Sequence, residues 1–249
     1  MIRNSFIFLK EVGKEKEKKL WSSGIRTWDD FLEKKKIRFI PEQKRALYDA
    51  EVKRAKEELY ALNAKYFSTL LPQAEHWRLY NFFKSEAVFL DIETTGISEG
   101  YLTVIGLFDG INTKTMVKGI NLDIAQLKKE LGRYKLIVTF NGASFDLPYI
   151  AKSFPEILPK LPHFDLRHGC ARIGLKGGLK EIEKKLGIKR NKTIDGLNGG
   201  DALDLWRTFK ATGDDYYLKL LIEYNEEDII NLRFIADYVY EKLKNINFL

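Results

Sequence analysis

Two acidic residues stand inside an apolar segment, FLDIETTGI at residues 89–97, whose composition is typical of a buried strand. Alternate residues of a strand point to the same face of a sheet, so Asp91 and Glu93 lie side by side. An unpaired carboxylate is costly to bury, because only an opposite charge or hydrogen bonds offset the loss of its hydration. The segment therefore predicts that other groups or ions compensate these two carboxylates.

Two later segments contain carboxylates in comparable settings. In IVTFNGASFD, at residues 137–146, an apolar strand runs into a turn and places Asp146 at the start of a helix, where it could also serve as an N-cap. In YNEEDIINL, at residues 224–232, Tyr224 and Asp228 are four residues apart and share a helical face. The adjacent Glu226 and Glu227 leave open that this is an ordinary solvated acidic turn.

Together the segments form an ordered set of four carboxylates. If they converge at one end of a sheet they repel one another unless divalent cations join them. Mg²⁺ and Mn²⁺ are hard cations that take oxygen ligands. Two such ions roughly 4 Å apart stabilise both the attacking and the leaving oxygen of a phosphoryl displacement. The set therefore predicts a site for two divalent cations, Mg²⁺ or Mn²⁺.

The sequences DIETTG, NGASFD and YNEED resemble the three motifs of the DEDD (DnaQ-like) 3′–5′ exonucleases, a superfamily with a ribonuclease H-like fold. The pair Tyr224 and Asp228 matches the tyrosine-type variant, since the histidine-type variant requires His where this chain has Glu223. The flanking sequences are similar to those of the YprB-like branch and of archaeal, single-strand-specific exonucleases of the exonuclease I type. The resemblance covers about residues 85–240.

The resemblance implies roles for individual residues. Asp91, Glu93 and Asp228 would hold the metal ion that activates water, with Asp91 bridging both ions and Asp146 holding or orienting the second. Tyr224 would position the attacking water. A tyrosine with a pKa of about 10 is a poor base alone, so we expect the metal to do most of the activation.

The resemblance also implies a set of substrate-binding residues. Thr94, Thr95 and Gly96 follow the metal-binding strand, where backbone N–H groups can meet the terminal nucleotide, although the threonines could equally be turn residues. Asn141 and Phe145 are candidates for its sugar and base. The segment RIGLKGGLK, at residues 172–180, could contact phosphate in a strand-binding groove.

The activity implied is metal-dependent 3′–5′ hydrolysis of single-stranded nucleic acid, with DNA as the expected substrate and 5′-mononucleotides as products, in a setting such as DNA repair. A structure-specific endonuclease of ribonuclease H-like fold is the enzymatic alternative. A basic, non-catalytic nucleic-acid-binding module is the other alternative, although all four carboxylates and Tyr224 are present.

The elements that must position these residues alternate after residue 85. Strands are predicted at residues 86–94, 101–110, 114–119 and 135–140, and helices at 122–132, 177–188, 201–213 and 214–244. The resemblance implies a mixed five-stranded sheet flanked by helices, in an α/β domain over residues 85–249. Residues 1–84 read as a basic, helical appendage, with a Thr27–Asp30 capping box and helices at 41–67 and 75–83.

Composition agrees with a nucleic-acid partner. Residues 1–85 hold 19 of the 42 Lys and Arg and 12 of the 35 Asp and Glu, so the whole net charge of +7 lies there, and 23 of each remain beyond. Trp21, Trp28 and Trp77 are expected in the core, although one or two of them could instead stack on bases. A single cysteine excludes an internal disulfide, and no apolar run is long enough for a membrane helix. We expect a cytoplasmic protein, and the appendage could support a homo-oligomeric ring, such as a trimer, around the strand.

Overall fold

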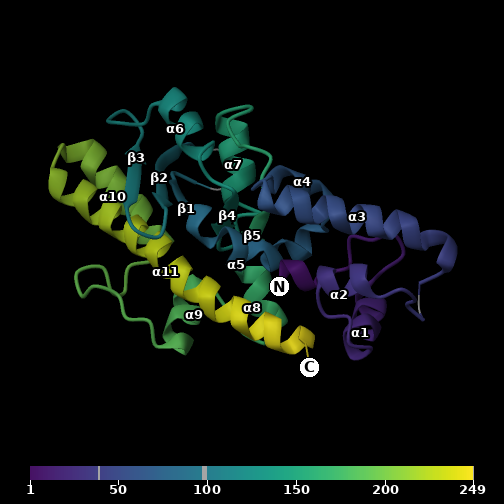
Figure 1. Ribbon diagram of the computed structural model, residues 1–249. Coiled ribbons are helices and arrows are strands. Elements are labelled where there is room, and N and C mark those ends of the chain that lie inside the picture. Colours follow the sequence, from purple (N-terminus) through teal and green to yellow (C-terminus); the bar gives the residue numbers. More distant parts are fainter. Residues whose placement is uncertain (39, 97–99, 249) are drawn as a thin grey trace.

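A five-stranded mixed sheet forms the centre of the computed structural model, which describes residues 1–38, 40–96 and 100–248 (Figure 1). Its strands are β1 (Ala87–Thr94), β2 (Leu102–Phe108), β3 (Thr113–Val117), β4 (Leu136–Thr139) and β5 (His163–Asp165), in the order β3-β2-β1-β4-β5. The central strand β1 pairs antiparallel with β2 and parallel with β4. The expected mixed sheet is confirmed. Its fifth strand was implied by the resemblance alone, because three residues are too few to show a period.

Helices cover both faces of the sheet. On one face, α6 (Ile124–Leu131) and α7 (Asp146–Ser153) pack on the side chains that include Val88, Leu90 and Ile92 of β1. The other face lies under α8 (Leu166–Arg172), α10 (Gly199–Thr212) and α11 (Asp215–Phe248), with the short α9 (Leu179–Leu186) beside α11. Asp91 and Glu93 alternate with the residues of the first face, so they point toward α11.

The N-terminal third is helical and lies beside the β5 edge of the sheet (Figure 1). Its elements are η1 (Ile2–Asn4), α1 (Lys14–Ser22), α2 (Trp28–Glu33), α3 (Glu42–Tyr60), α4 (Ala64–Leu70), η2 (Gln73–Leu79), α5 (Tyr80–Phe83) and η3 (Lys84–Glu86). One continuous apolar cluster joins residues such as Leu20 and Phe67 to Phe89 of β1 and Ile235 of α11. The three tryptophans expected in the core, Trp21, Trp28 and Trp77, are buried there.

Two N-terminal predictions need correction. The helix expected over 41–67 is interrupted, because Leu62 has a φ of 55° and the side chain of Asn63 accepts the N–H of Tyr66 to cap a new helix, α4. The segment 75–83 is mostly 3₁₀-helical. The capping box is confirmed: Thr27 accepts the N–H of Asp30, whose carboxylate accepts the N–H of Thr27 in return.

Among the described helices, none combines the length and the apolar character that a bilayer crossing requires.

Candidate active site

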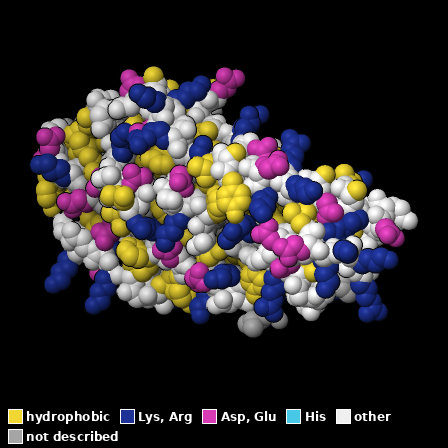
Figure 2. Space-filling model, in the orientation of Figure 1, with side chains coloured by type: hydrophobic (Ala, Val, Ile, Leu, Met, Phe, Trp, Pro, Cys, Tyr) yellow, Lys and Arg dark blue, Asp and Glu magenta, His cyan; other side chains and the backbone are white. Residues whose placement is uncertain are grey.

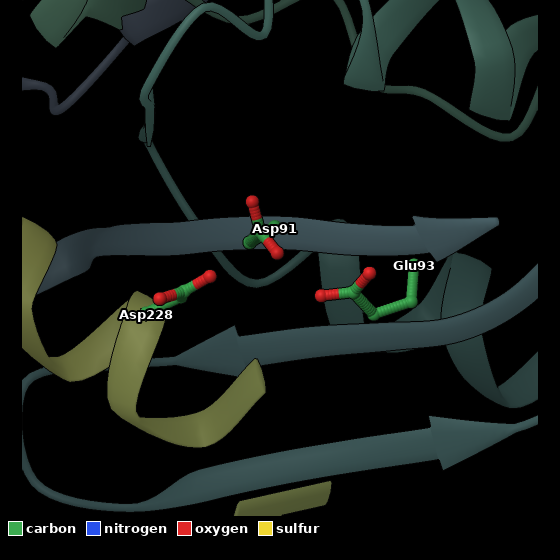
Figure 3. A group of neighbouring side chains, drawn as sticks. All are labelled: Asp91, Glu93 and Asp228. Atoms are coloured by element: carbon green, nitrogen blue, oxygen red, sulfur yellow. The ribbon is translucent and has the colours of Figure 1, made fainter. Parts of the chain in front are cut away.

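Three carboxylates meet between β1 and α11. Asp91 and Glu93 of β1 and Asp228 of α11 point toward one another (Figure 3), and one oxygen of each lies within 4.8 Å of the others. Asp228 is 6% exposed, so the acidic stretch of α11 is not a solvated turn at this position. The strand fixes two of the carboxylates that could hold a metal ion, and the helix supplies the third.

Asp146, the fourth predicted carboxylate, approaches the same strand from the α7 side. It is the first residue of α7, and its Oδ1 accepts the backbone N–H of Ile92 at 3.1 Å, between the two acidic residues of β1. It is buried and does not belong to the cluster of three whose oxygens lie within 4.8 Å. The structure therefore brings three of the four carboxylates together directly and places the fourth against the backbone that joins two of them.

Burial and mutual repulsion raise the pKa of every carboxyl in the group. The pKa of Asp91 lies well above its usual value, through burial and then the charges of Asp146, Asp228 and Glu93. Burial raises the pKa of Glu93 to about 8 and that of Asp146 to about 7. The pKa of Asp228 rises only to about 6, because the positive charge of Arg190 partly offsets the effect of burial. These carboxyl groups cannot all be ionised together without added positive charge, so they are suitable ligands for hard divalent cations.

Tyr224 lies one helical turn before Asp228, on the same side of α11, and is 4% exposed. Burial raises its pKa further above the usual value, and the neighbouring carboxylates Asp228, Glu93 and Asp91 act in the same direction. The hydroxyl therefore keeps its proton at neutral pH. It can donate a hydrogen bond or orient a water molecule, but its deprotonated form is even scarcer at neutral pH than that of an ordinary tyrosine, so it does not serve as a general base.

Asn225 supports Asp91 and was not predicted from the sequence. Its Nδ2 donates to Asp91 Oδ2 at 3.0 Å, and its own side chain is completely buried. Gly106 makes this possible, since it lies opposite Asp91 in β2 and a Cβ there would stand 2.0 Å from Asn225 Oδ1. Asn225 Oδ1 itself is buried and has no hydrogen-bond partner among the described residues. The missing side chain in β2 thus leaves the space in which Asn225 of α11 reaches Asp91 of β1.

Arg190 holds Asp228 from the other side and was also not predicted. Its guanidinium donates two hydrogen bonds of 2.7 Å to Glu183 of α9 and one to Asp228, and all three side chains are buried. Asn231 donates to the same Glu183 at 3.1 Å. The only sequence signal for Arg190 is that it lies in a segment, residues 160–192, with ten Lys and Arg but three Asp and Glu. Positive charge therefore reaches the cluster from the loop after α9.

The residues that follow β1 make turn hydrogen bonds. The Thr94 hydroxyl donates to the carbonyl of Gly96 at 3.2 Å, and Tyr149 donates to the same carbonyl at 3.3 Å. Thr95 Oγ1 accepts the N–H of Tyr101 at 2.9 Å. Both threonine side chains thus stabilise the turn that ends the strand, as the alternative interpretation of these residues expects. A contact with a nucleotide by Thr94, Thr95 or Gly96 stays a prediction.

Asn141 lies in the loop between β4 and α7, with a φ of 69°. Asp165 at the end of β5 fixes this loop, since its carboxylate accepts the N–H groups of Asn141 at 2.9 Å and Ala143 at 3.0 Å. Arg167 donates to Asn141 Oδ1 at 2.8 Å. Phe145 is half-buried, with its ring 5.7 Å from that of Tyr149. The loop is therefore rigidly placed beside the acidic cluster.

A cleft of about 640 Å³ opens next to this loop. Its walls include Phe140, Asn141, Arg167, Lys176, Gly178 and Leu179. It runs from the loop after β4 to the first turn of α9. On the face seen in Figure 2, Lys and Arg side chains also gather over the N-terminal helices, interspersed with acidic ones. Polar and basic groups therefore line the cleft beside the loop after β4.

Comparison with known proteins gives one family match. The model of the RNase_H superfamily matches residues 88–240, which span β1 to most of α11. No curated protein matches the chain significantly.

Several solved structures are similar at low identity. The family B DNA polymerase of the hyperthermophilic archaeon Pyrobaculum calidifontis is 14% identical, with a TM-score of 0.49 over 61% of this chain and 24% of the polymerase. Brucella melitensis NrnC with bound Mg²⁺ is 19% identical, with a TM-score of 0.47 over 71% of this chain and 79% of NrnC. A structure described as the apo form of a nuclease is 15% identical, with a TM-score of 0.48 and coverage of 72% and 81%. The present chain spans about a quarter of the polymerase, and the family match depends on the superfamily model alone.

Proposed function

Because the chain belongs to the RNase_H superfamily, we propose that it is a metal-dependent 3′–5′ exonuclease of the DEDD tyrosine type. Its proposed substrate is single-stranded nucleic acid, with DNA as the first to test, and its products are 5′-mononucleotides. The observation that carries the proposal is the convergence of Asp91, Glu93 and Asp228 within 4.8 Å, with Tyr224 one turn away. A site that served only to bind nucleic acid would have no use for acidic groups that repel phosphate.

In the proposed mechanism, Asp91, Glu93 and Asp228 would hold divalent cations, and Asp146, which accepts the N–H of Ile92, would hold or orient a further ligand at the same site. When bound, such cations lower the pKa of water and stabilise charge on a phosphoryl group. Tyr224 keeps its proton and donates a hydrogen bond that orients the attacking water.

Other residues fix the geometry. Asn225 holds one oxygen of Asp91 in a single orientation, and Arg190 does the same for Asp228. The protein thus supplies positioned ligands and a fixed donor, the two contributions that metal-assisted phosphoryl transfer requires of it.

We propose that the strand enters along the cleft beside the loop after β4. Asn141 and Phe145 would meet the terminal sugar and base, while Arg167 and Lys176 would contact upstream phosphates. Asn141 Oδ1 already accepts from Arg167, so its Nδ2 is the atom that would donate to the sugar. Thr94 and Gly96 would offer backbone N–H groups, whereas the N–H of Thr95 already donates to the carbonyl of Tyr101 at 3.0 Å. Thr95 would therefore act only by stabilising the turn.

The test is digestion of single-stranded DNA labelled at its 5′ end, with Mg²⁺ or Mn²⁺ and with EDTA. The expected products are strands that shorten one nucleotide at a time, and a second strand labelled on its 3′-terminal nucleotide should release a labelled mononucleotide first. Parallel reactions with RNA and duplex DNA establish the substrate. Internal fragments at the first time points would identify an endonuclease, and strand binding without hydrolysis would identify a binding module.

The Asp91→Asn and Asp228→Asn variants should lose at least about 100-fold in rate, since each removes a charged ligand of a metal that does most of the chemistry. The Asp204→Asn variant is the matched control, because that side chain is 73% exposed and forms only a surface ion pair with Arg207. Normal metal-dependent digestion by both ligand variants would refute the assignment. The boundary at residue 85 and the ring-like oligomer stay proposals from the sequence, and light scattering at assay concentration tests the second.

A further inference from the structure

Lys180 brings a second positive charge to the acidic cluster. It lies in the first turn of α9, and its Nζ is 4.2 Å from the centroid of the Tyr224 ring. The nitrogen is buried and has no hydrogen-bond partner among the residues that the structure describes. It forms no ion pair within 4.0 Å in that part of the chain, although it is near enough to Asp228 and Glu93 to sense their charges. An ammonium group with three N–H donors thus lies beside the site with all three unused.

The contacts of Lys180 do not account for its position. Stacking over an aromatic ring stabilises a cation, but it does not replace hydrogen bonds to oxygen, and an unpaired buried ammonium is costly. A lysine that served only to neutralise the carboxylates would pair directly with one of them, as Arg190 does with Asp228 and Glu183. Lys180 instead stays apart from the carboxylates, above the ring of the residue proposed to orient water.

The balance of charge identifies the class of ligand. When all are ionised, the carboxylates Asp91, Glu93, Asp146, Asp228 and Glu183 exceed the cations Lys180 and Arg190 by three. Two divalent cations would turn this excess into one positive charge, and a phosphodiester carries one negative charge. The Nη1 of Arg190 is also buried and has no hydrogen-bond partner among the described residues, so it is a second donor of this kind at the same site. An anion with several oxygen acceptors fits both groups.

We propose that Lys180 is a catalytic residue whose ammonium group donates a hydrogen bond to a non-bridging oxygen of the scissile phosphate. This deepens the proposed exonuclease function and depends on it. The cation on the oxygen offsets the negative charge that the phosphoryl group carries through the displacement, and its place above Tyr224 sets the phosphate against the water that Tyr224 orients. The upstream cations of the cleft, such as Lys176, would instead contact phosphates that do not react.

The test is a thermodynamic cycle that combines a substitution in the protein with a modification of the substrate. Binding of a fluorescent single-stranded oligonucleotide is measured with Ca²⁺, for the wild type and for Lys180→Met, and gels verify that the strand stays intact. Three strands are compared: all-phosphodiester, one with a neutral methylphosphonate at the 3′-terminal linkage, and one with it three linkages upstream. The Lys184→Met variant is the control, because Lys184 lies on the same helix with an exposed side chain.

If Lys180 contacts the terminal phosphate, its removal and the methylphosphonate remove the same hydrogen bond. At the terminal linkage, the combined loss of binding affinity should then be about tenfold smaller than the product of the two separate losses, as expected for one charge-assisted bond. At the upstream linkage, the two losses of affinity should be additive in free energy. Lys184→Met should show additive losses at both positions. Additive losses within about twofold for Lys180→Met at the terminal linkage would overturn the proposal.

A second measurement separates this role from a structural one. Because the ammonium has no hydrogen-bond partner among the described residues, Lys180→Met should unfold at the same temperature as the wild type or higher in EDTA. A lower unfolding temperature, or failure to fold, in both Lys180→Met and Lys180→Gln would show that the lysine is structural and would overturn the proposal. If the wild type neither binds nor digests the unmodified strand, the exonuclease function fails instead, and the two results are distinguishable.

Discussion

Arg190 lets the stability of the site be tested without any substrate. Its guanidinium is 4% exposed and is the shared partner of Glu183 and Asp228, with two bonds of 2.7 Å to the former. The Arg190→Met variant keeps most of the volume but leaves two buried carboxylates without their cation. Removing one partner of a buried ion pair destabilises a protein by about 3–5 kcal/mol, mainly because the remaining charge is uncompensated. For a chain of this size that corresponds to a fall in the unfolding temperature of roughly 6–20 °C.

The size of the loss should depend on pH and on metal. Arg190 lowers the pKa of Asp228 against the effect of burial, so the variant carboxyl should take up a proton more readily, which relieves the unpaired charge at low pH. We therefore expect a smaller loss at pH 5.5 than at pH 8.5. Added Mn²⁺ should restore part of the stability at pH 8.5, because a cation between β1 and α11 compensates Asp228 in place of the guanidinium.

The assay is thermal and urea unfolding in EDTA and in Mn²⁺, at both pH values. Arg207→Met is the matched control, since Arg207 is 67% exposed and its ion pair with Asp204 is long, at 3.5 Å; it should change stability by less than about 0.5 kcal/mol. If Arg190→Met in EDTA at pH 8.5 unfolds within about 1 kcal/mol of the wild type, then the buried network does not compensate Asp228 and the reasoning is wrong.

Two further predictions concern the same cluster. Carboxyl groups titrate near pH ~4 in the unfolded chain, whereas those of Glu93, Asp146 and Asp228 have pKa values between about 6 and about 8 in the folded protein. The metal-free protein should therefore lose stability as pH rises from about 5 to 8.5. Calorimetry in EDTA should show an unfolding temperature that falls over this range, and Mg²⁺ should reverse the fall most at high pH. A flat profile would contradict the raised pKa values. Gly106→Ala places a Cβ 2.0 Å from Asn225 Oδ1 and should cost about 1–3 kcal/mol of stability together with much of the activity, whereas Gly199→Ala, where no atom lies within 4 Å, should change neither.

The parts of the site that follow a local period were predictable from sequence. The strand period places Asp91 and Glu93 on one face, and the helical period does the same for Tyr224 and Asp228, because each rule needs only neighbouring residues. The convergence of strand and helix, by contrast, followed only from the family resemblance, and repulsion between the carboxylates was the reason to expect cations there. The structure brings Asp91, Glu93 and Asp228 together and places Asp146 on the backbone of Ile92.

The supporting residues were not predictable, because their partners lie far away in sequence. Arg190 and Asp228 are 38 residues apart, and Asn225 and Asp91 are 134 apart, so no local pattern marks either pair. A glycine inside a strand, such as Gly106 in β2, is expected from sequence to weaken the strand. The space it leaves for Asn225 can be recognised only once the packing of α11 on β2 is known. The break in the long N-terminal helix was missed because Leu62 and Asn63 are compatible with helix and only tertiary packing selects the turn.

The long helix α11 connects the acidic cluster with the N-terminal segment. Its 34 residues extend about 50 Å, with Asp228 near the middle and Tyr240 accepting a hydrogen bond from the chain's first amino group near the far end. The helix thus contributes to the acidic cluster with its middle part and to the packing of residues 1–84 with its C-terminal part. If divalent cations are held as proposed, they join α11 to β1 and so fix the helix on which residues 1–84 pack. Removing them with EDTA should therefore make the N-terminal third easier to detach, which limited proteolysis can measure.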